Sequence, residues 1–180
     1  MRCGRRTVAG WSGLVLALTV ALAGCGSSGV PPEKWARSVC LAVKPWSTQI
    51  DASVTAARSK ITSASAPEQT KAELVALFEQ AQRASADALE KVRKAGTPDV
   101  DKGEQSAAQL AASLQAAEKA FGRAAAGVKA LSTTDRAAFN SGVVKVGDRL
   151  SKDNNASTDQ LRDISSKELE KAFVDVPECG

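Results

Sequence analysis

The 180-residue chain contains no histidine and no tyrosine. Without histidine, neither a Ser-His-Asp nor a Cys-His catalytic arrangement can form, and a His-containing zinc site or the Glu-x-x-His motif of di-iron bundles is excluded as well. The phosphate-binding motifs GxxxxGK[ST] and GxGxxG are also missing. Nearly all carboxylates fall on the polar faces of predicted helices, where they are ordinary solvated surface. We therefore expect no enzymatic activity, no metal and no cofactor.

Without residues 1–24, the chain has almost no excess of positive charge. The whole chain has 24 Lys and Arg against 20 Asp and Glu. Arg2, Arg5 and Arg6 precede residue 24 and every acid follows it, which leaves 21 bases against 20 acids. This balance gives no electrostatic basis for nucleic-acid binding, and we expect no nucleic-acid partner.

Residues 1–24 have the pattern of a bacterial signal peptide. The arginines precede an apolar run whose core, Leu14 to Ala23, is short for a membrane-spanning helix, which needs roughly 20 residues. Leu22-Ala23-Gly24-Cys25 resembles a lipobox, after which the cysteine thiol is linked to diacylglycerol. We expect lipidation at Cys25 and a lipid anchor on the extracytoplasmic face of the cell membrane. The alternative is a plain secretory peptide with a chance cysteine. Arg5 and Arg6 fit the positively charged start of an ordinary signal peptide better than they fit a twin-arginine signal.

The four cysteines separate by position. Cys3 lies in the signal segment and Cys25 takes the lipid, so Cys40 and Cys179 are the thiols left in an oxidising compartment. We expect them to form a disulfide, with two free thiols as the alternative. Residues 25–32 are predicted to be a lipidated tether, of which the seven residues after Cys25 reach at most about 25 Å. Residues 33–180 are predicted to form one helical bundle domain.

Composition and periodicity favour helices throughout this domain. It is rich in Ala, Glu, Lys, Gln and Leu, which favours helix over sheet. Apolar residues recur at steps of three and four. The stripes run from Trp35 to Ile61, Leu74 to Val92, Ala107 to Leu131 and Ala138 to Leu150, with a last piece from Leu161 to Phe173. This pattern predicts an all-α fold, an up-and-down four-helix bundle with a short extra C-terminal helix. Such a bundle brings the first helix close to the end of the chain, as the Cys40–Cys179 bond also requires.

Local signals refine this prediction. Pro45 predicts a kink between Leu41 and Pro45, or a break with a restart at Pro45. Ser132 with Asp135 predicts a capping box for the fourth helix, and Ser165 with Glu168 a restart within the last piece. The polar residues Ser151 to Ser157 are predicted to end the fourth helix.

Glycines inside the predicted helices call for a reason, because each costs about 1 kcal/mol relative to alanine. Close helix crossing is the expected one, and a ligand lodged against bared backbone is the alternative. The four positions are Gly122, Gly127, Gly142 and Gly147.

Two further groups have both a functional and a structural interpretation. Asp153, Asn155, Ser157 and Asp159 alternate as in the first half of a calcium loop. The required Gly and bidentate Glu are replaced by Thr158 and Ile164, so a polar interhelical loop is the better interpretation. Trp35 and Trp46 lie on one face of the first helix and are expected in the core. The alternative places one of them against the membrane or a partner.

The lipobox, the spacing Trp35-x4-Cys40-x4-Pro45-Trp46 and the C-terminal cysteine together resemble small alanine-rich helical lipoproteins and secreted proteins of actinobacteria. The resemblance implies a helical fold and a cell-surface location. It carries over no site residues beyond Cys25, Cys40 and Cys179.

The leading functional hypothesis is a non-enzymatic, membrane-anchored interaction domain with a protein partner in the cell envelope. One alternative is a binding module for a lipid or small hydrophobic ligand, and another is an immunity or inhibitor protein. A cavity of about 300 Å³ or more, lined by residues of the apolar helix stripes, would favour the ligand-binding hypothesis. Apolar stripes packed together without a cavity would favour the hypothesis of a protein partner. An exposed apolar patch of several hundred Å² would mark the partner surface.

Overall fold

The computed structural model describes residues 29–161 and 166–180, without the side chains of 156–161. Residues 1–24, Cys25 and Ser165 therefore lie outside the described residues, as do the side chains of Ser157 and Asp159. The helices are α1 (Pro32–Lys60), α2 (Pro67–Lys94), α3 (Gly103–Lys129), α4 (Arg136–Leu161) and α5 (Lys167–Asp175), followed by the 3₁₀ turn η1 (Pro177–Cys179).

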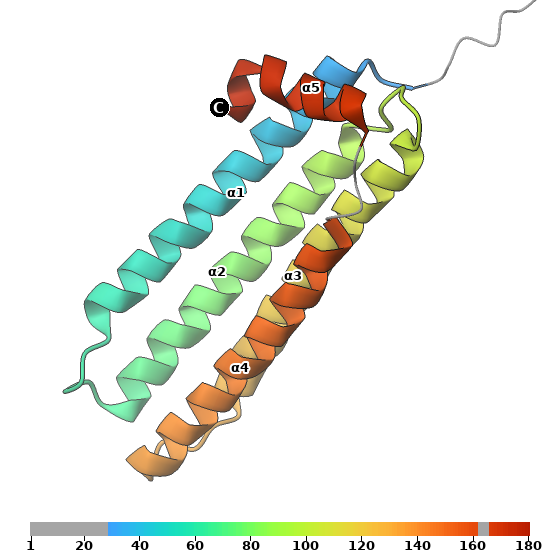
Figure 1. The fold of residues 1–180 in the computed structure, drawn as a ribbon. Coiled ribbons are helices and arrows are strands. Elements are labelled where there is room, and N and C mark those ends of the chain that lie inside the picture. Colours follow the sequence, from blue (N-terminus) through green and yellow to red (C-terminus); the bar gives the residue numbers. More distant parts are fainter. Residues whose placement is uncertain (1–28, 162–165) are drawn as a thin grey trace, which may run out of the picture.

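The predicted all-α bundle with a short extra C-terminal helix is confirmed. The four long helices alternate in direction, and α5 lies across the end of the bundle at which α1 begins (Figure 1). We call this end, which also holds the turn between α2 and α3, the proximal end. The distal end holds the turns between α1 and α2 and between α3 and α4.

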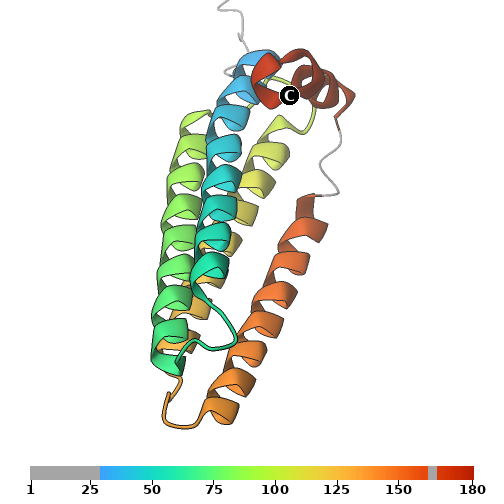
Figure 2. The same cartoon turned by 90° about the vertical axis from the view of Figure 1, so that its left-hand side faces the viewer.

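The bundle is open along one side. Each long helix packs on its neighbour in the sequence, most extensively α2 on α3. Helix α4 packs on α3, meets α2 only briefly, and has no close backbone contact with α1 among the described residues. Figure 2 shows α4 standing apart from α1, with α3 behind them. The end of the chain returns to α1 through α5 and η1 instead.

Helix boundaries follow from local chemistry, with one correction to the predicted cap. Pro32 and Pro67 open α1 and α2, where a missing N–H costs nothing. The predicted capping box is wrong, because Asp135 alone caps α4: its Oδ1 accepts bonds from the backbone nitrogens of Ala137 and Ala138 at 2.8 and 3.1 Å. Ser132 contacts Thr134 instead.

Two segments are more regular than predicted. Helix α1 runs unbroken through Pro45, which excludes the break with a restart. Helix α4 does not end in the polar stretch from Ser151 to Ser157 but continues to Leu161. Within this stretch the Arg123 guanidinium of α3 donates to the Asp153 carboxylate at 2.7 Å, an ion pair that a propensity argument does not include. Asp153 and Asn155 therefore lie on a helix, where residues two apart face different directions, and not in a calcium-type loop.

Large apolar side chains gather at the proximal end. Trp35, Val39 and Leu169 form one buried cluster there, and a second buries Leu89, Val92 and Leu114 between α1, α2 and α3. Alanine supplies eleven of the twenty buried apolar residues in the described part of the chain. These alanines are spread along the bundle and each buries little area, while Val128 and Phe139 are fully buried towards the distal end.

Polar contacts hold the distal half together. The Lys71 ammonium donates to the carbonyl of Leu131 at 2.7 Å, and the Arg136 guanidinium donates to the carbonyl of Ser65 at 2.9 Å. Lys129 of α3 donates to Glu79 of α2, and this hydrogen bond holds the pKa of the Glu79 carboxyl below its ordinary value. These bonds join the turns and helices around the buried side chains of Val128 and Phe139.

Gly122 and Gly127 lie at close helix crossings, as predicted, and Gly142 lies against the turn that follows α3. A Cβ at Gly142 would lie 2.5 Å from Cδ2 of Leu131, one at Gly127 would lie 3.0 Å from Val146, and one at Gly122 would lie 3.0 Å from Gln82. Gly147 is different: a Cβ there would meet nothing within 4 Å, so the prediction of a close crossing is wrong at this position. Nothing in the structure explains a glycine at residue 147.

These surroundings give the substitutions Gly142→Ala and Gly147→Ala different expected effects. Gly147→Ala should raise the free energy of unfolding by about 1 kcal/mol, because it removes backbone freedom of the unfolded chain and meets open space. Gly142→Ala should be less stable than Gly147→Ala by about 1 kcal/mol or more, because Leu131 must move. Urea denaturation of the two variants measures the difference, and equal stabilities would contradict the close packing of Leu131 against Gly142.

Candidate functional site

The segment that precedes α1 is fixed to the bundle at the proximal end. Val30 pairs with the turn between α2 and α3 in a single parallel bridge: its N–H donates to the Thr97 carbonyl at 2.7 Å, and the Asp99 N–H donates to the Val30 carbonyl at 2.8 Å. A Cβ at Gly29 would lie 2.7 Å from Cβ of Asp99, so this backbone approach requires glycine. We call residues 29–30 and 96–99 the tether clamp.

Trp35 of α1 forms a hydrogen bond with the tether clamp. Its indole Nε1 donates to the carbonyl of Gly96 at 3.0 Å, and its ring meets Phe173 of α5 edge-on with centroids 5.8 Å apart. Gly96 has a φ of 76°, which a residue with a side chain rarely adopts. With 1% of its surface exposed, Trp35 is a core residue as predicted, and the alternative of a membrane-facing Trp35 is wrong. Trp46 is partly buried and donates to Oγ of Ser85 at 2.9 Å.

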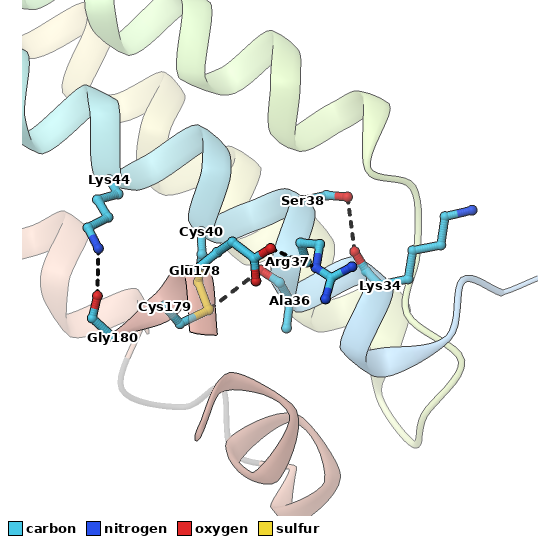
Figure 3. Close-up of a disulfide and its surroundings, with 9 residues drawn as sticks. All are labelled: Lys34, Ala36, Arg37, Ser38, Cys40, Lys44, Glu178, Cys179 and Gly180. Carbon is cyan, nitrogen blue, oxygen red and sulfur yellow. Dashed lines mark hydrogen bonds and ion pairs between the residues drawn. A yellow bond between two sulfur atoms is a disulfide. The ribbon is translucent and has the colours of Figure 1, made fainter. Parts of the chain in front are cut away.

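The predicted disulfide between Cys40 and Cys179 is confirmed. It joins α1 to η1 with the two Cα atoms 5.1 Å apart (Figure 3). Two polar contacts flank it: Arg37 pairs with Glu178 at 3.1 Å, and the Lys44 ammonium donates to the carbonyl of Gly180 at 2.5 Å. The Cys179 sulfur lies 3.8 Å from the Ala36 carbonyl, a contact without a hydrogen bond, since a disulfide sulfur carries no proton.

Breaking this bond should destabilise the fold markedly. Cys40→Ser should lower the melting temperature, because the unfolded chain is released from a loop with a sequence separation of 139 residues. The chain-entropy model gives about 5 kcal/mol as the upper end of the effect. Cys179→Ser and the double variant should melt with Cys40→Ser, since each removes the same bond. Calorimetry measures the four proteins, and an unchanged melting curve would refute the stabilising role.

A second candidate site lies between α3 and α4, in their distal parts. It is a half-open groove of about 380 Å³, which we call the α3–α4 groove. Its apolar lining is mostly small, with Ala120, Ala124 and Gly127 from α3 and Gly142, Val146 and Leu150 from α4. Gly127 lets α3 approach Val146 of α4, and Gly142 lets α4 approach Leu131 of the preceding turn, while space remains beside these contacts.

The polar lining of this groove is mainly cationic. Arg123, Lys145 and Arg149 contribute three positive charges, and Asp153 contributes one negative charge. The ion pair between Arg123 and Asp153 crosses from α3 to α4. Lys145 and Arg149 lie exposed one helical turn apart on α4, and no ion pair joins either of them to a described side chain. The groove thus has a net charge of about plus two.

The cations of the groove were not predicted from the sequence. The available signal was the pair Lys145 and Arg149, four residues apart and close after Gly142, but apolar periodicity alone does not say which neighbouring helix they face. Cys25 lies outside the described residues, so its lipidation stays a prediction.

Comparisons of the chain with protein-family models, curated proteins and solved structures find no match. The resemblance to actinobacterial lipoproteins therefore stays a prediction. Within residues 29–161 and 166–180, no helix is long and apolar enough to cross a membrane. The same described residues contain no group of three or more acidic, cysteine or histidine side chains placed to hold a metal ion.

Proposed function

We propose that this chain is a lipoprotein anchored at Cys25 to the extracytoplasmic face of the cell membrane, and that its bundle binds a small ligand without catalysis in the α3–α4 groove. The anchor is supported by the signal pattern of residues 1–24 and by the lipobox. The Cys40–Cys179 bond agrees with an oxidising compartment outside the cytoplasm.

The tether clamp gives the anchored protein an orientation. Five residue steps separate Cys25 from Val30, a span of at most about 17 Å. Because Val30 is bonded to Thr97 and Asp99, the proximal end of the bundle would lie near the membrane surface. The α3–α4 groove begins at Ala120, about 25 Å along α3 from Gly103, so it would face the space beyond the membrane surface.

The observation that carries the ligand proposal is the volume of the groove. At about 380 Å³ it exceeds the 300 Å³ above which a ligand is favoured over a filled stripe, and its lining includes the stripe residues Ala124, Leu131 and Leu150. A protein partner has less support. The exposed large apolar side chains of the described residues are Leu41, Val144 and Val174, which lie on three different helices.

The anchor is tested by labelling bacteria that express the full chain with an alkyne analogue of palmitate. The wild type should incorporate the label, and intact-mass analysis should show a mature chain that begins at Cys25. Cys25→Ser should abolish labelling, since no thiol remains for the thioether. Cys3→Ser is the matched control and should label like the wild type. Labelling that survives Cys25→Ser would show that Cys25 is not the lipidated residue.

Ligand binding is tested on residues 25–180 with Cys25→Ser, exported from a cleavable secretory signal peptide, which carries no lipid and keeps residues 29–180 unchanged. The uncharged dye N-phenylnaphthylamine should fluoresce more strongly on binding. Ala126→Leu enlarges an exposed residue that lines the groove and should weaken binding by about tenfold. Ala112→Leu makes the same change at an exposed position of α3 outside the groove and should leave binding unchanged. Equal effects of the two substitutions would place the dye elsewhere.

A further inference from the structure

We infer that the ligand of the α3–α4 groove is a single-chain lipid with an anionic head group, whose chain lies along the apolar lining and whose head lies against Lys145 and Arg149. This inference rests on the proposed function and names its ligand class. The supporting observations are the volume of the groove, the chemistry of its lining, its surplus charge and its position in the bundle.

The volume of the groove falls in the range of small-molecule sites. The groove is half-open and offers about 380 Å³, near the lower end of that range. An unbranched hydrocarbon chain suits a furrow lined by Ala120, Ala124 and Gly127, because such a chain needs contact along its length and no hydrogen bonds.

The charges select the head group. Arg123 is engaged by Asp153 at 2.7 Å, so its charge is already balanced within the groove. Lys145 and Arg149 lie one turn apart on one face of α4, and their charges are not balanced by any other residue that lines the groove. A guanidinium and an ammonium side by side bind phosphate or carboxylate oxygens through charge-assisted hydrogen bonds. An anionic head would neutralise this pair while the attached chain covers the apolar lining.

The charge of the groove is local, which makes the preference specific to it. Without residues 1–24 the chain carries 21 bases against 20 acids, so general attraction of anions to the molecule is weak. The groove also lies about 25 Å along α3 from the proximal end. A ligand there would be a single lipid molecule taken from solution, and not a head group within the bilayer that holds the anchor.

The experiment compares amphiphiles that share a chain and differ in the head. Dodecyl phosphate and dodecylphosphocholine are titrated, below their micelle concentrations, into the exported chain with Cys25→Ser, and calorimetry measures both affinities. The anionic amphiphile should bind about three- to tenfold more tightly, since each exposed charged contact contributes up to about 1 kcal/mol. Added salt should reduce this preference.

Variants assign the preference to the groove. Lys145→Gln with Arg149→Gln should bring the two affinities to within about twofold and leave dodecylphosphocholine binding unchanged. Lys91→Gln with Arg93→Gln removes two exposed cations from α2 and is the matched control, which should keep the preference. Circular dichroism checks that all variants keep their helix content.

Each other outcome overturns a defined claim. Equal affinities for the two heads, or a preference that survives Lys145→Gln with Arg149→Gln, would refute the anionic head while the groove remains a binding site. If neither amphiphile binds and N-phenylnaphthylamine does not bind either, the proposed function itself is wrong. Binding that Ala126→Leu leaves intact would place the lipid outside the groove.

Discussion

The closure of the chain at the proximal end is the constraint on which the remainder of the structure depends. Helix α4 contacts α3 and hardly any other helix in the described part of the chain, so helix packing alone does not close the bundle. Closure comes from the last residues, where α5 and η1 return to α1 and Cys179 is bonded to Cys40. The bond restricts the unfolded chain, and beneath it Ala36, Ala172 and Val176 are buried together.

The two halves of the bundle are held together in different ways. The proximal half combines the disulfide, the tether clamp and the large side chains around Trp35. The distal half combines the buried side chains of Val128 and Phe139 with bonds such as Arg136 to Ser65. Small residues permit close approach of α3 and α4 but do not fill the space beside the crossings, and the α3–α4 groove is the result.

The sequence predicted the helices and their closure, but not every contact between them. Apolar periodicity located all four long helices, and compartment and topology together predicted Cys40 with Cys179, which the structure confirms. Periodicity identifies the apolar face of a helix without identifying its neighbour, so the open side between α1 and α4 was not foreseen. Polarity was misleading at Asp153, because an ion pair to another helix stabilises what a propensity argument interprets as a loop. The tether clamp depends on Gly29 approaching Asp99, a long-range contact that no local pattern encodes.

The tether clamp and the α3–α4 groove lie in different halves of the bundle, so the proposed attachment and the proposed binding use separate surfaces. A ligand groove at the proximal end would compete for the surface that α5, η1 and the tether clamp already cover. Larger side chains in the distal half would stabilise α4 but would fill the space between α3 and α4. Alanine and glycine there keep the groove open at the cost of buried area, and the disulfide at the other end offsets part of that loss. The stability of a bundle with an unfilled groove therefore depends in part on a bond located at the opposite end of the molecule.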